Sequence, residues 1–258
     1  MSKVPKFRFP AGQTWDYFTD VRDTLVKAHE RVMDSFEKKI TYNARIDGYR
    51  ADADFNRINI ILDTLRNETF EFFFTESVVN GIVERFLDSV KNHTAAQFGR
   101  QFKAVLGIDP IGRDSRLLGI IEAANKENIS YIQSIPSNYH DKVETVILQG
   151  LRRGQSTNDI ASELQKVYEV SRDRAKFIAR DQAGSLTADL TKARHEASGL
   201  KTFIWSTAGD DSVRGTHRAY DGIVFTWDKG ADGKGLLPGH DYGCRCVAEI
   251  NDEELLSQ

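Results

Sequence analysis

The chain has 258 residues, with 35 Lys and Arg against 38 Asp and Glu, and its formal net charge is −3. Its 40% hydrophobic and 28% charged residues are typical of a folded globular protein and exclude a largely disordered one. No stretch reaches the roughly 18 to 20 apolar residues of a membrane span, and the first residues lack the apolar core of a secretion signal. The two cysteines exclude a disulfide-rich scaffold, so we expect a protein of a reducing cytoplasm without membrane contact.

One cluster of basic residues is dense enough to consider as a nucleic-acid contact. It consists of Arg172, Arg174, Lys176 and Arg180. A dedicated duplex-binding domain is strongly basic, because neutralised phosphates supply much of its affinity, and no segment of this chain is strongly basic. The cluster therefore predicts weak, sequence-independent contact with DNA at most, and a solvated helix face explains the same pattern.

Residues from about 14 to 200 are predicted to be helical, because apolar residues recur there every three or four positions. Gly107 followed by Pro110 predicts a helix end, and Gly154 predicts another. Three helix starts are predicted. The first comes directly after Pro136 and Ser137, the second is at a capping box formed by Ser156 and Asp159, and the third is at an N-cap on Ser171.

The pattern changes after residue 200. The segments 202–207, 222–227 and 244–250 are rich in strand-forming residues, and glycine-rich loops separate them. The predicted fold is therefore α+β, a mainly helical body (about 14–200) with a small, loop-rich C-terminal unit that contains β-strands. We expect two domains, a helical region over 1–140 and a second domain over 141–258, with helices in 141–199 and a small sheet in 201–250.

The C-terminal loops carry an ordered set of polar motifs. A helix with Ile178-Ala179-Arg180-Asp181 precedes the strand of Trp205, and then come Asp210, Arg214, His217, Asp221-Gly222, Pro238-Gly239 and Cys244-Arg245-Cys246. In this order the chain, from about 140 to 250, resembles the phage Mu F-like head-morphogenesis proteins. Each motif alone is weak, and the order of all of them is specific.

The resemblance implies a minor structural protein of a tailed bacteriophage or prophage. Such a protein would lie in the virion, in the head interior or near the portal, after assembly in the host cytoplasm. It would act in head morphogenesis and in genome packaging or ejection, with the portal protein, the major capsid protein or both as partners. The region 1–140 would dock on the portal or capsid. We expect no enzymatic activity, because no recognisable catalytic set is present; a nucleic-acid-binding accessory protein is the alternative, followed by a small Cys/His enzyme.

Two histidines and two cysteines at the end of the chain have a spacing that permits a zinc site. His217, His240, Cys244 and Cys246 offer two nitrogen and two sulfur ligands, a set that suits tetrahedral zinc. In a strand, residues two apart point to the same face, so both thiols can converge while Arg245 faces away. A metal-free cluster of buried cysteines and hydrogen-bonded histidines is the alternative.

The same loops allow two catalytic pairs and a structural network. Cys244 with His240 would form a thiolate–imidazole pair, and Asp210 with His217 an acid–base pair. No oxyanion hole, phosphate loop or dinucleotide-binding glycine motif accompanies them. We therefore predict that Asp210, Arg214 and Asp221 belong to a polar network that holds the long loop together with His217, because arginine can bond a carboxylate through two donors.

Overall fold

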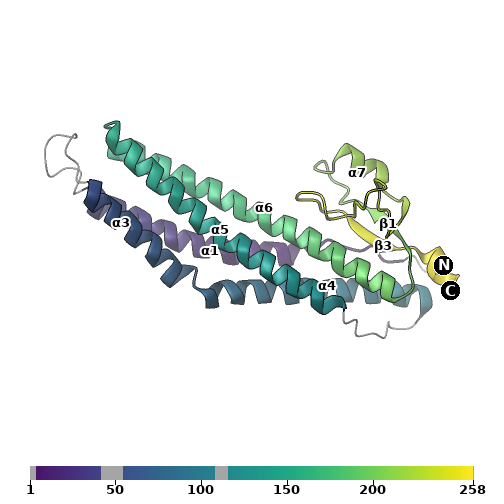
Figure 1. Cartoon of the computed structure of the whole chain (residues 1–258). Helices are drawn as coiled ribbons and strands as arrows, with labels where there is room; N and C mark the ends of the chain where they lie inside the picture. The colour runs from purple at the N-terminus through teal and green to yellow at the C-terminus, as the bar shows by residue number, and fades with distance from the viewer. Residues whose placement is uncertain (1–3, 42–54, 108–115, 258) are drawn as a thin grey trace. The chain divides into compact units, whose positions relative to one another are not determined.

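A computed structural model describes residues 4–41, 55–107 and 116–257 (Figure 1). The elements in chain order are α1 (Ala11–Ser35), a π-helical turn η1 (Phe36–Ile40), α3 (Phe55–Glu68), a second π-helical turn η2 (Thr69–Phe73), α4 (Glu76–Leu106), α5 (Arg116–Arg152), α6 (Thr157–Ala197), β1 (Thr202–Ser206), α7 (Gly215–Tyr220), β2 (Val224–Thr226), β3 (Val247–Ile250) and α8 (Asp252–Leu256). A mainly helical α+β fold is confirmed. Among the described residues, no helix combines the length and the apolar character that a membrane span requires.

The chain forms two compact units. The first contains residues 1–17, 83–128 and 177–258, and the second contains residues 18–82 and 129–176. The boundary expected at residue 140 lies inside α5, so the compact units do not follow it. We refer to the first as the sheet-containing unit and to the second as the all-helical unit.

The all-helical unit is built from apolar stripes. The predicted stripe of α1, which consists of Val21, Leu25, Ala28 and Val32, is almost fully buried. Residues on α5 form a second stripe, namely Ile132, Ile135, Tyr139, Val143 and Ile147. His29 joins the two helices, because its Nδ1 lies 2.7 Å from the Tyr139 hydroxyl.

The helix start predicted after Pro136 is wrong, because α5 runs through this proline. Pro136 has no N–H to donate to the carbonyl of the preceding turn, which costs roughly 3 kcal/mol in a helix interior. The buried stripe continues on both sides of it, and each large apolar side chain contributes about 1.5 to 3 kcal/mol on burial. Packing therefore outweighs the missing hydrogen bond.

The cap predicted at Ser171 is also wrong, because α6 is one helix from Thr157 to Ala197. Ser171 is buried inside it and donates its hydroxyl to the carbonyl of Val167, 2.9 Å away. The start predicted at Ser156 is confirmed: the Asp159 backbone N–H donates to Ser156 Oγ at 3.1 Å, and the Ser156 N–H donates to Asp159 Oδ2 at 3.3 Å.

Glycines end the helices as predicted where the structure describes them. Gly107 and Gly154 both have positive φ, at 73° and 66°, which is the left-handed conformation of a helix C-terminus. Pro110, the second part of the first signal, lies outside the described residues. Gly154 leads into the short turn between α5 and α6, which therefore run antiparallel in the all-helical unit (Figure 1).

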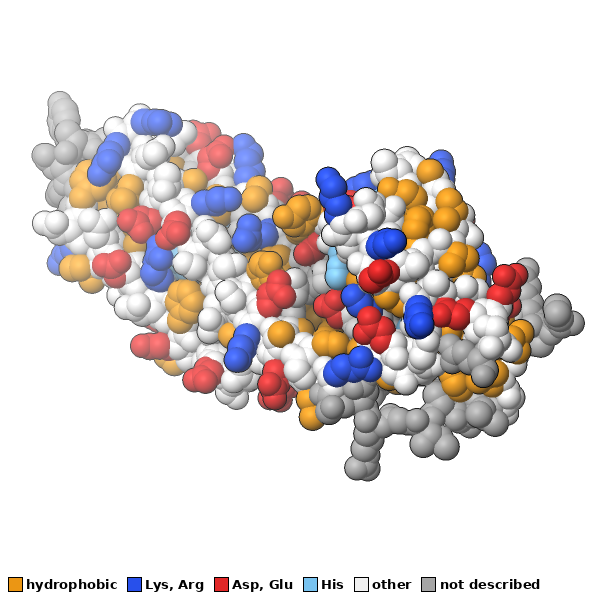
Figure 2. Space-filling model, turned by 45° about the vertical axis from the view of Figure 1, so that its right-hand side comes forward, with side chains coloured by type: hydrophobic (Ala, Val, Ile, Leu, Met, Phe, Trp, Pro, Cys, Tyr) orange, Lys and Arg blue, Asp and Glu red, His pale blue; other side chains and the backbone are white. Residues whose placement is uncertain are grey.

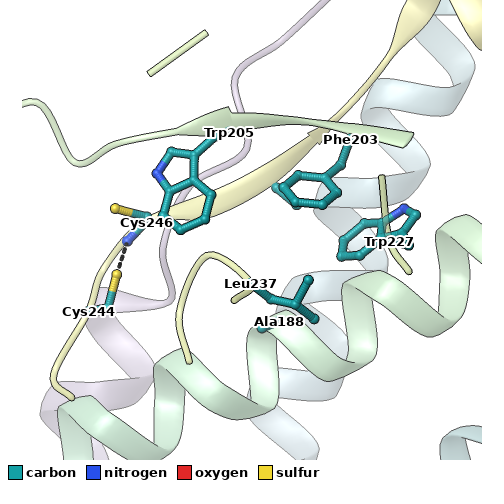
Figure 3. Close-up of a cluster of buried hydrophobic side chains, with 8 residues drawn as sticks. Ala188, Phe203, Trp205, Trp227, Leu237, Cys244 and Cys246 are labelled. Carbon is teal, nitrogen blue, oxygen red and sulfur yellow. Dashed lines mark hydrogen bonds between the residues drawn. The ribbon is translucent and has the colours of Figure 1, made fainter. Parts of the chain in front are cut away.

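The sheet-containing unit has one antiparallel sheet of three strands in the order β2-β1-β3. Phe203 of β1 pairs with Phe225 of β2, and Trp205 pairs with Ala248 of β3. The strands are shorter than predicted, and β3 begins at Val247, so both cysteines precede it. One face of the sheet covers α6, where Phe203, Trp205 and Trp227 pack above Ala188 (Figure 3).

Two glycines bring a loop directly against the backbone of α6. A Cβ atom at Gly184 would lie 2.7 Å from the carbonyl oxygen of Cys244 and 2.8 Å from that of Gly239. A Cβ atom at Gly239, which has a φ of 102°, would lie 2.5 Å from the carbonyl oxygen of Gly184. The segment before Cys244 can approach α6 this closely only because neither position has a side chain.

Candidate functional site

The structure brings His217, Cys244 and Cys246 together in the sheet-containing unit. The two thiol sulfurs lie 3.5 Å and 3.7 Å from Nδ1 of His217, respectively. All three side chains are buried, with 3 to 4% of their surface exposed. They are held by different parts of the fold, since His217 lies on α7 and the cysteines lie in the segment that enters β3.

Tight turns position the cysteine segment. The Cys244 N–H donates to the carbonyl of Asp241 at 2.8 Å, and the Gly243 N–H donates to the side chain of Asp181 on α6, also at 2.8 Å. The next turn is closed by the Cys246 N–H, which lies 3.4 Å from the sulfur of Cys244. The thiols converge as predicted from the C-x-C spacing, although the backbone there is a loop and not a strand.

The two thiols affect each other's protonation. A hydrogen bond from Cys246 lowers the pKa of the Cys244 thiol, and further N–H donors support the shift. The same interaction, together with burial, raises the pKa of Cys246. The indole of Trp205, which lies beside Cys246, opposes this rise (Figure 3).

His240, the fourth residue of the predicted zinc set, does not join the other three. Its Nε2 lies 2.8 Å from Oδ1 of Asp189 on α6. The cluster of potential metal ligands among the described residues contains His217, Cys244 and Cys246 alone. The two catalytic pairs considered from the sequence do not form either, because His217 is the imidazole that faces Cys244, and Asp210 has a different partner.

The three residues of the predicted polar network, Asp210, Arg214 and Asp221, each have different partners. Asp210 forms an ion pair with Arg245 at 2.7 Å, which lowers the pKa of the Asp210 carboxyl group. Arg214 lies 3.3 Å from the carboxylate of Asp241 and donates to the carbonyl of Tyr242 at 2.6 Å. The third predicted member is separate: Asp221 accepts hydrogen bonds from the backbone N–H and the hydroxyl of Thr207, at 2.8 Å and 2.9 Å.

Asp241 is the residue that sequence reasoning missed. One of its oxygens, Oδ2, lies 3.4 Å from Nε2 of His217, on the side of the ring that faces away from the thiols. Asp241 thus connects His217 with Arg214. Asp241 directly follows His240, and this position was the one feature of the sequence that could have indicated its role. Adjacent residues point in different directions, however, and the sequence does not show which of the two faces the cluster.

The cluster lines a cavity of about 330 Å³. Three arginines also line it: Arg180 of α6, Arg214 and Arg245. Arg180 is the one member of the predicted basic cluster among the lining residues. Another member, Arg172, bonds to Asp173 at 3.0 Å. Figure 2 shows basic and acidic side chains interspersed on the drawn face, as a chain with a net charge of −3 would present them.

Parts of the chain match known proteins. Residues 141–249 match the family described as Phage Mu protein F like protein. The matched range contains the whole cluster, the three strands up to Glu249 and the Gly184–Gly239 approach. The match of this segment to the family confirms the resemblance inferred from the order of its motifs.

Three curated relatives match parts of the chain. An uncharacterized protein of Haemophilus influenzae is 37% identical over 176 residues, which is 67% of this chain and 38% of that protein. An uncharacterized protein of Methanocaldococcus jannaschii is 32% identical over 115 residues, 44% of this chain and 18% of that protein. Minor head protein GP7 of Bacillus phage SPP1 is 28% identical over 120 residues, 42% of this chain and 39% of that protein. The matched segments span less than two fifths of these relatives. No solved structure matches the chain.

Proposed function

We propose that this chain is a minor structural protein of a tailed bacteriophage or prophage that acts in head morphogenesis. The observation that carries the proposal is the family match of residues 141–249, together with the similarity to a minor head protein of Bacillus phage SPP1. The protein would be a component of the virion, in the head interior or near the portal, and would reach it from the host cytoplasm during assembly. A contribution to genome packaging or ejection follows from the same position.

The portal protein, the major capsid protein or both are the proposed partners, and the region 1–140 is the proposed docking region. Ile60 and Phe72 support this role, because 64% and 67% of their surfaces are exposed. Large apolar and aromatic side chains are enriched at protein–protein interfaces. Replacing both by Ser should weaken capture of the portal or capsid protein and leave the fold unchanged.

Deleting the gene from the phage or prophage that encodes the chain should lower the yield of infectious particles. Supplying the wild-type chain in trans should restore the yield, and a tagged chain should sediment with purified procapsids or virions. The substitution Gly119→Ala serves as a matched control that should also restore it, because a Cβ atom there meets no other atom within 4 Å. Normal titres from a clean deletion would contradict the proposal.

Contact with DNA is proposed as weak and independent of sequence. The chain has a net charge of −3, and Arg172 of the basic cluster is already paired with Asp173. Affinity should therefore fall steeply with salt, because it comes from displaced counterions. Replacing Arg174 and Lys176 by Gln should reduce the residual affinity equally for all sequences. Tight binding above physiological salt with a preference for one sequence would favour the alternative, a nucleic-acid-binding accessory protein.

A structural role without turnover is proposed in place of an enzymatic one. The sequence around the thiols and the imidazole has no oxyanion-hole, phosphate-loop or dinucleotide-binding motif. The purified chain should not hydrolyse generic ester, peptide or phosphate substrates. Turnover that is lost in Cys244→Ser would support the third possibility, a small Cys/His enzyme.

A further inference from the structure

We propose that Nδ1 of His217 and the sulfurs of Cys244 and Cys246 bind one zinc ion, with water from the adjoining cavity as the fourth ligand. This inference does not depend on the head role, because it rests on the geometry of the cluster alone. It assigns a three-residue site in which His240 has no part.

The distances in the cluster are those of a tetrahedral zinc site. Zinc binds thiolate sulfur at about 2.3 Å and imidazole nitrogen at about 2.0 to 2.1 Å, so a tetrahedral angle separates the two ligand atoms by about 3.6 Å. The observed separations from His217 Nδ1 are 3.5 Å to Cys244 and 3.7 Å to Cys246. All three potential ligand atoms lie within 4.8 Å of one another. Both nitrogen–sulfur separations therefore match those of a tetrahedral zinc site.

The charges also fit zinc. Each thiol loses its proton on binding, so the reaction releases two protons and places two negative sulfurs around a doubly positive ion. The assembled site is neutral, which matters because the three side chains are almost completely buried. A single sulfur in the same place would leave a net positive charge, and the soft sulfur ligands favour zinc over magnesium or calcium.

Asp241 supplies the outer contact that orients the histidine. Zinc-binding histidines usually donate their second ring N–H to a carboxylate or carbonyl, which directs the lone pair of the other nitrogen toward the metal. Here Oδ2 of Asp241 lies 3.4 Å from Nε2 of His217, while Nδ1 faces the sulfurs. Arg214 holds the same carboxylate at 3.3 Å. The ring is thus placed with the correct nitrogen toward the thiols.

The fourth position faces the cavity. His217, Cys244 and Cys246 all line it, so water can reach the ion from that side. His240 is directed instead to Asp189, at 2.8 Å, and this pair closes the alternative in which His240 completes the site. A site of three protein ligands with one exchangeable position is the result.

A Cys–His–Asp catalytic arrangement is the competing explanation for the same residues. In that arrangement one thiol would use His217 as its base, and the second thiol would have no role. The two sulfurs lie at nearly equal distances from the same nitrogen, and both are buried. This arrangement is the one expected when all three atoms bind one metal ion. Alkylation can separate the two explanations, because a catalytic thiol reacts fast and a zinc-bound pair does not.

The decisive experiment measures metal in the full chain, purified under reducing conditions and reconstituted with zinc sulfate before extensive dialysis. We expect a zinc-to-protein ratio near unity by elemental analysis. His217→Ala, Cys244→Ser and Cys246→Ser should lose at least nine tenths of this zinc, whereas the matched control His240→Ala should keep it. A wild-type chain without zinc would overturn the proposal, and equal loss in His240→Ala would overturn the three-residue site.

A second measurement uses the wild-type chain alone, in case the cysteine variants fail to fold. Both thiols should resist a thiol reagent until a chelator is added, and their reaction should then coincide with release of one zinc ion to a colorimetric indicator. Replacement of zinc by cobalt should give the strong visible absorption of a tetrahedral ion with sulfur ligands. Fast alkylation of one thiol in the zinc-treated protein, or a disulfide between the two cysteines, would overturn the site.

Discussion

The α5–α6 hairpin of the all-helical unit and the segment 202–250 of the sheet-containing unit are stabilised in different ways. In the hairpin, regular helices bury continuous apolar stripes, and this stability is strong enough to include Pro136 in the middle of α5. In the segment 202–250 the three strands have five, three and four residues, and long loops connect them. A sheet of this size is too small to be stable alone.

The loops compensate with specific contacts. Backbone meets backbone at Gly184 and Gly239, side chains such as Asp181 accept N–H groups from the loop, and Glu254 of α8 accepts those of Lys201 and Thr202 at 2.8 Å and 3.0 Å. Regular secondary structure therefore tolerates local violations, whereas the loop-rich segment depends on individual positions. Four substitutions or conditions test this difference.

Acidification should have the largest effect, and it should act on both units through buried histidines. Burial lowers the pKa of His195 to about 3 in the sheet-containing unit and that of His140 to about 4 in the all-helical unit. Because these values lie below the unfolded value near 6.5, the unfolded chain binds protons first as the pH falls. Stability is therefore complete above pH 6.5 and is lost toward pH 4. The loss at pH 5 should be about 2 kcal/mol for each histidine.

Urea unfolding between pH 7 and pH 4.5 measures this slope. His195→Phe and His140→Gln should each flatten it, and the second variant keeps a hydrogen-bonding side chain beside Thr69, which lies 2.8 Å from His140. His93 provides a control, because its Nε2–H donates to the Arg8 carbonyl oxygen at the protein surface, at 2.8 Å. An unchanged slope in both buried-site variants would show that carboxyl groups cause the acid sensitivity.

Gly184→Ala should have the next largest effect, a loss of about 3 kcal/mol, because the new methyl group meets two backbone carbonyl oxygens that cannot move aside. Gly119→Ala in α5 should instead stabilise the chain by up to about 1 kcal/mol, since its methyl group meets nothing and alanine favours a helix. Both variants belong to the sheet-containing unit. Tryptophan fluorescence during urea unfolding reports on it, because Trp205 and Trp227 lie in its core. Similar stabilities for the two variants would contradict the close approach.

Ser156→Ala should cost about 1 kcal/mol in the all-helical unit, because it removes the cap of α6. Ser162→Ala, six residues further along the same helix, is the matched control. Its hydroxyl donates to the Asn158 carbonyl, which also accepts a backbone hydrogen bond of the helix. We therefore expect the Ser162→Ala variant to be as stable as the wild type or slightly more stable. Circular dichroism melts of both variants measure the difference. An equal loss in both would mean that the cap does not contribute.

Asp210→Ala should have the smallest effect. It removes the ion pair with Arg245, but both groups are partly or largely in water, where such pairs contribute little. The unfolding midpoint should remain within experimental error of the wild type at 0.15 M salt. A clear loss would show that surface pairs, and not the glycine contacts, hold the loop.

The sequence by itself determined the elements whose signals are local. The Ser156–Asp159 capping box, the glycine helix ends and the apolar stripe of α1 were predictable because capping and helical periodicity depend on residues within a few positions of each other. The order of motifs from Ile178 to Cys246 was sufficient for the family, and the C-x-C spacing was sufficient to expect two converging thiols.

Only the tertiary structure decided the features that depend on distant partners. Packing against other helices carries α5 through Pro136 and α6 through Ser171, against their local preferences. His240 and Asp241 are adjacent in the sequence, yet one side chain reaches Asp189 and the other lies beside His217. The direction of each side chain follows from the turn that holds it, and that turn is set by the glycine contact with α6. The amino-acid sequence shows which histidines and cysteines could bind a metal ion. The close approach of the Gly239 backbone to the Gly184 backbone decides which of them lie together.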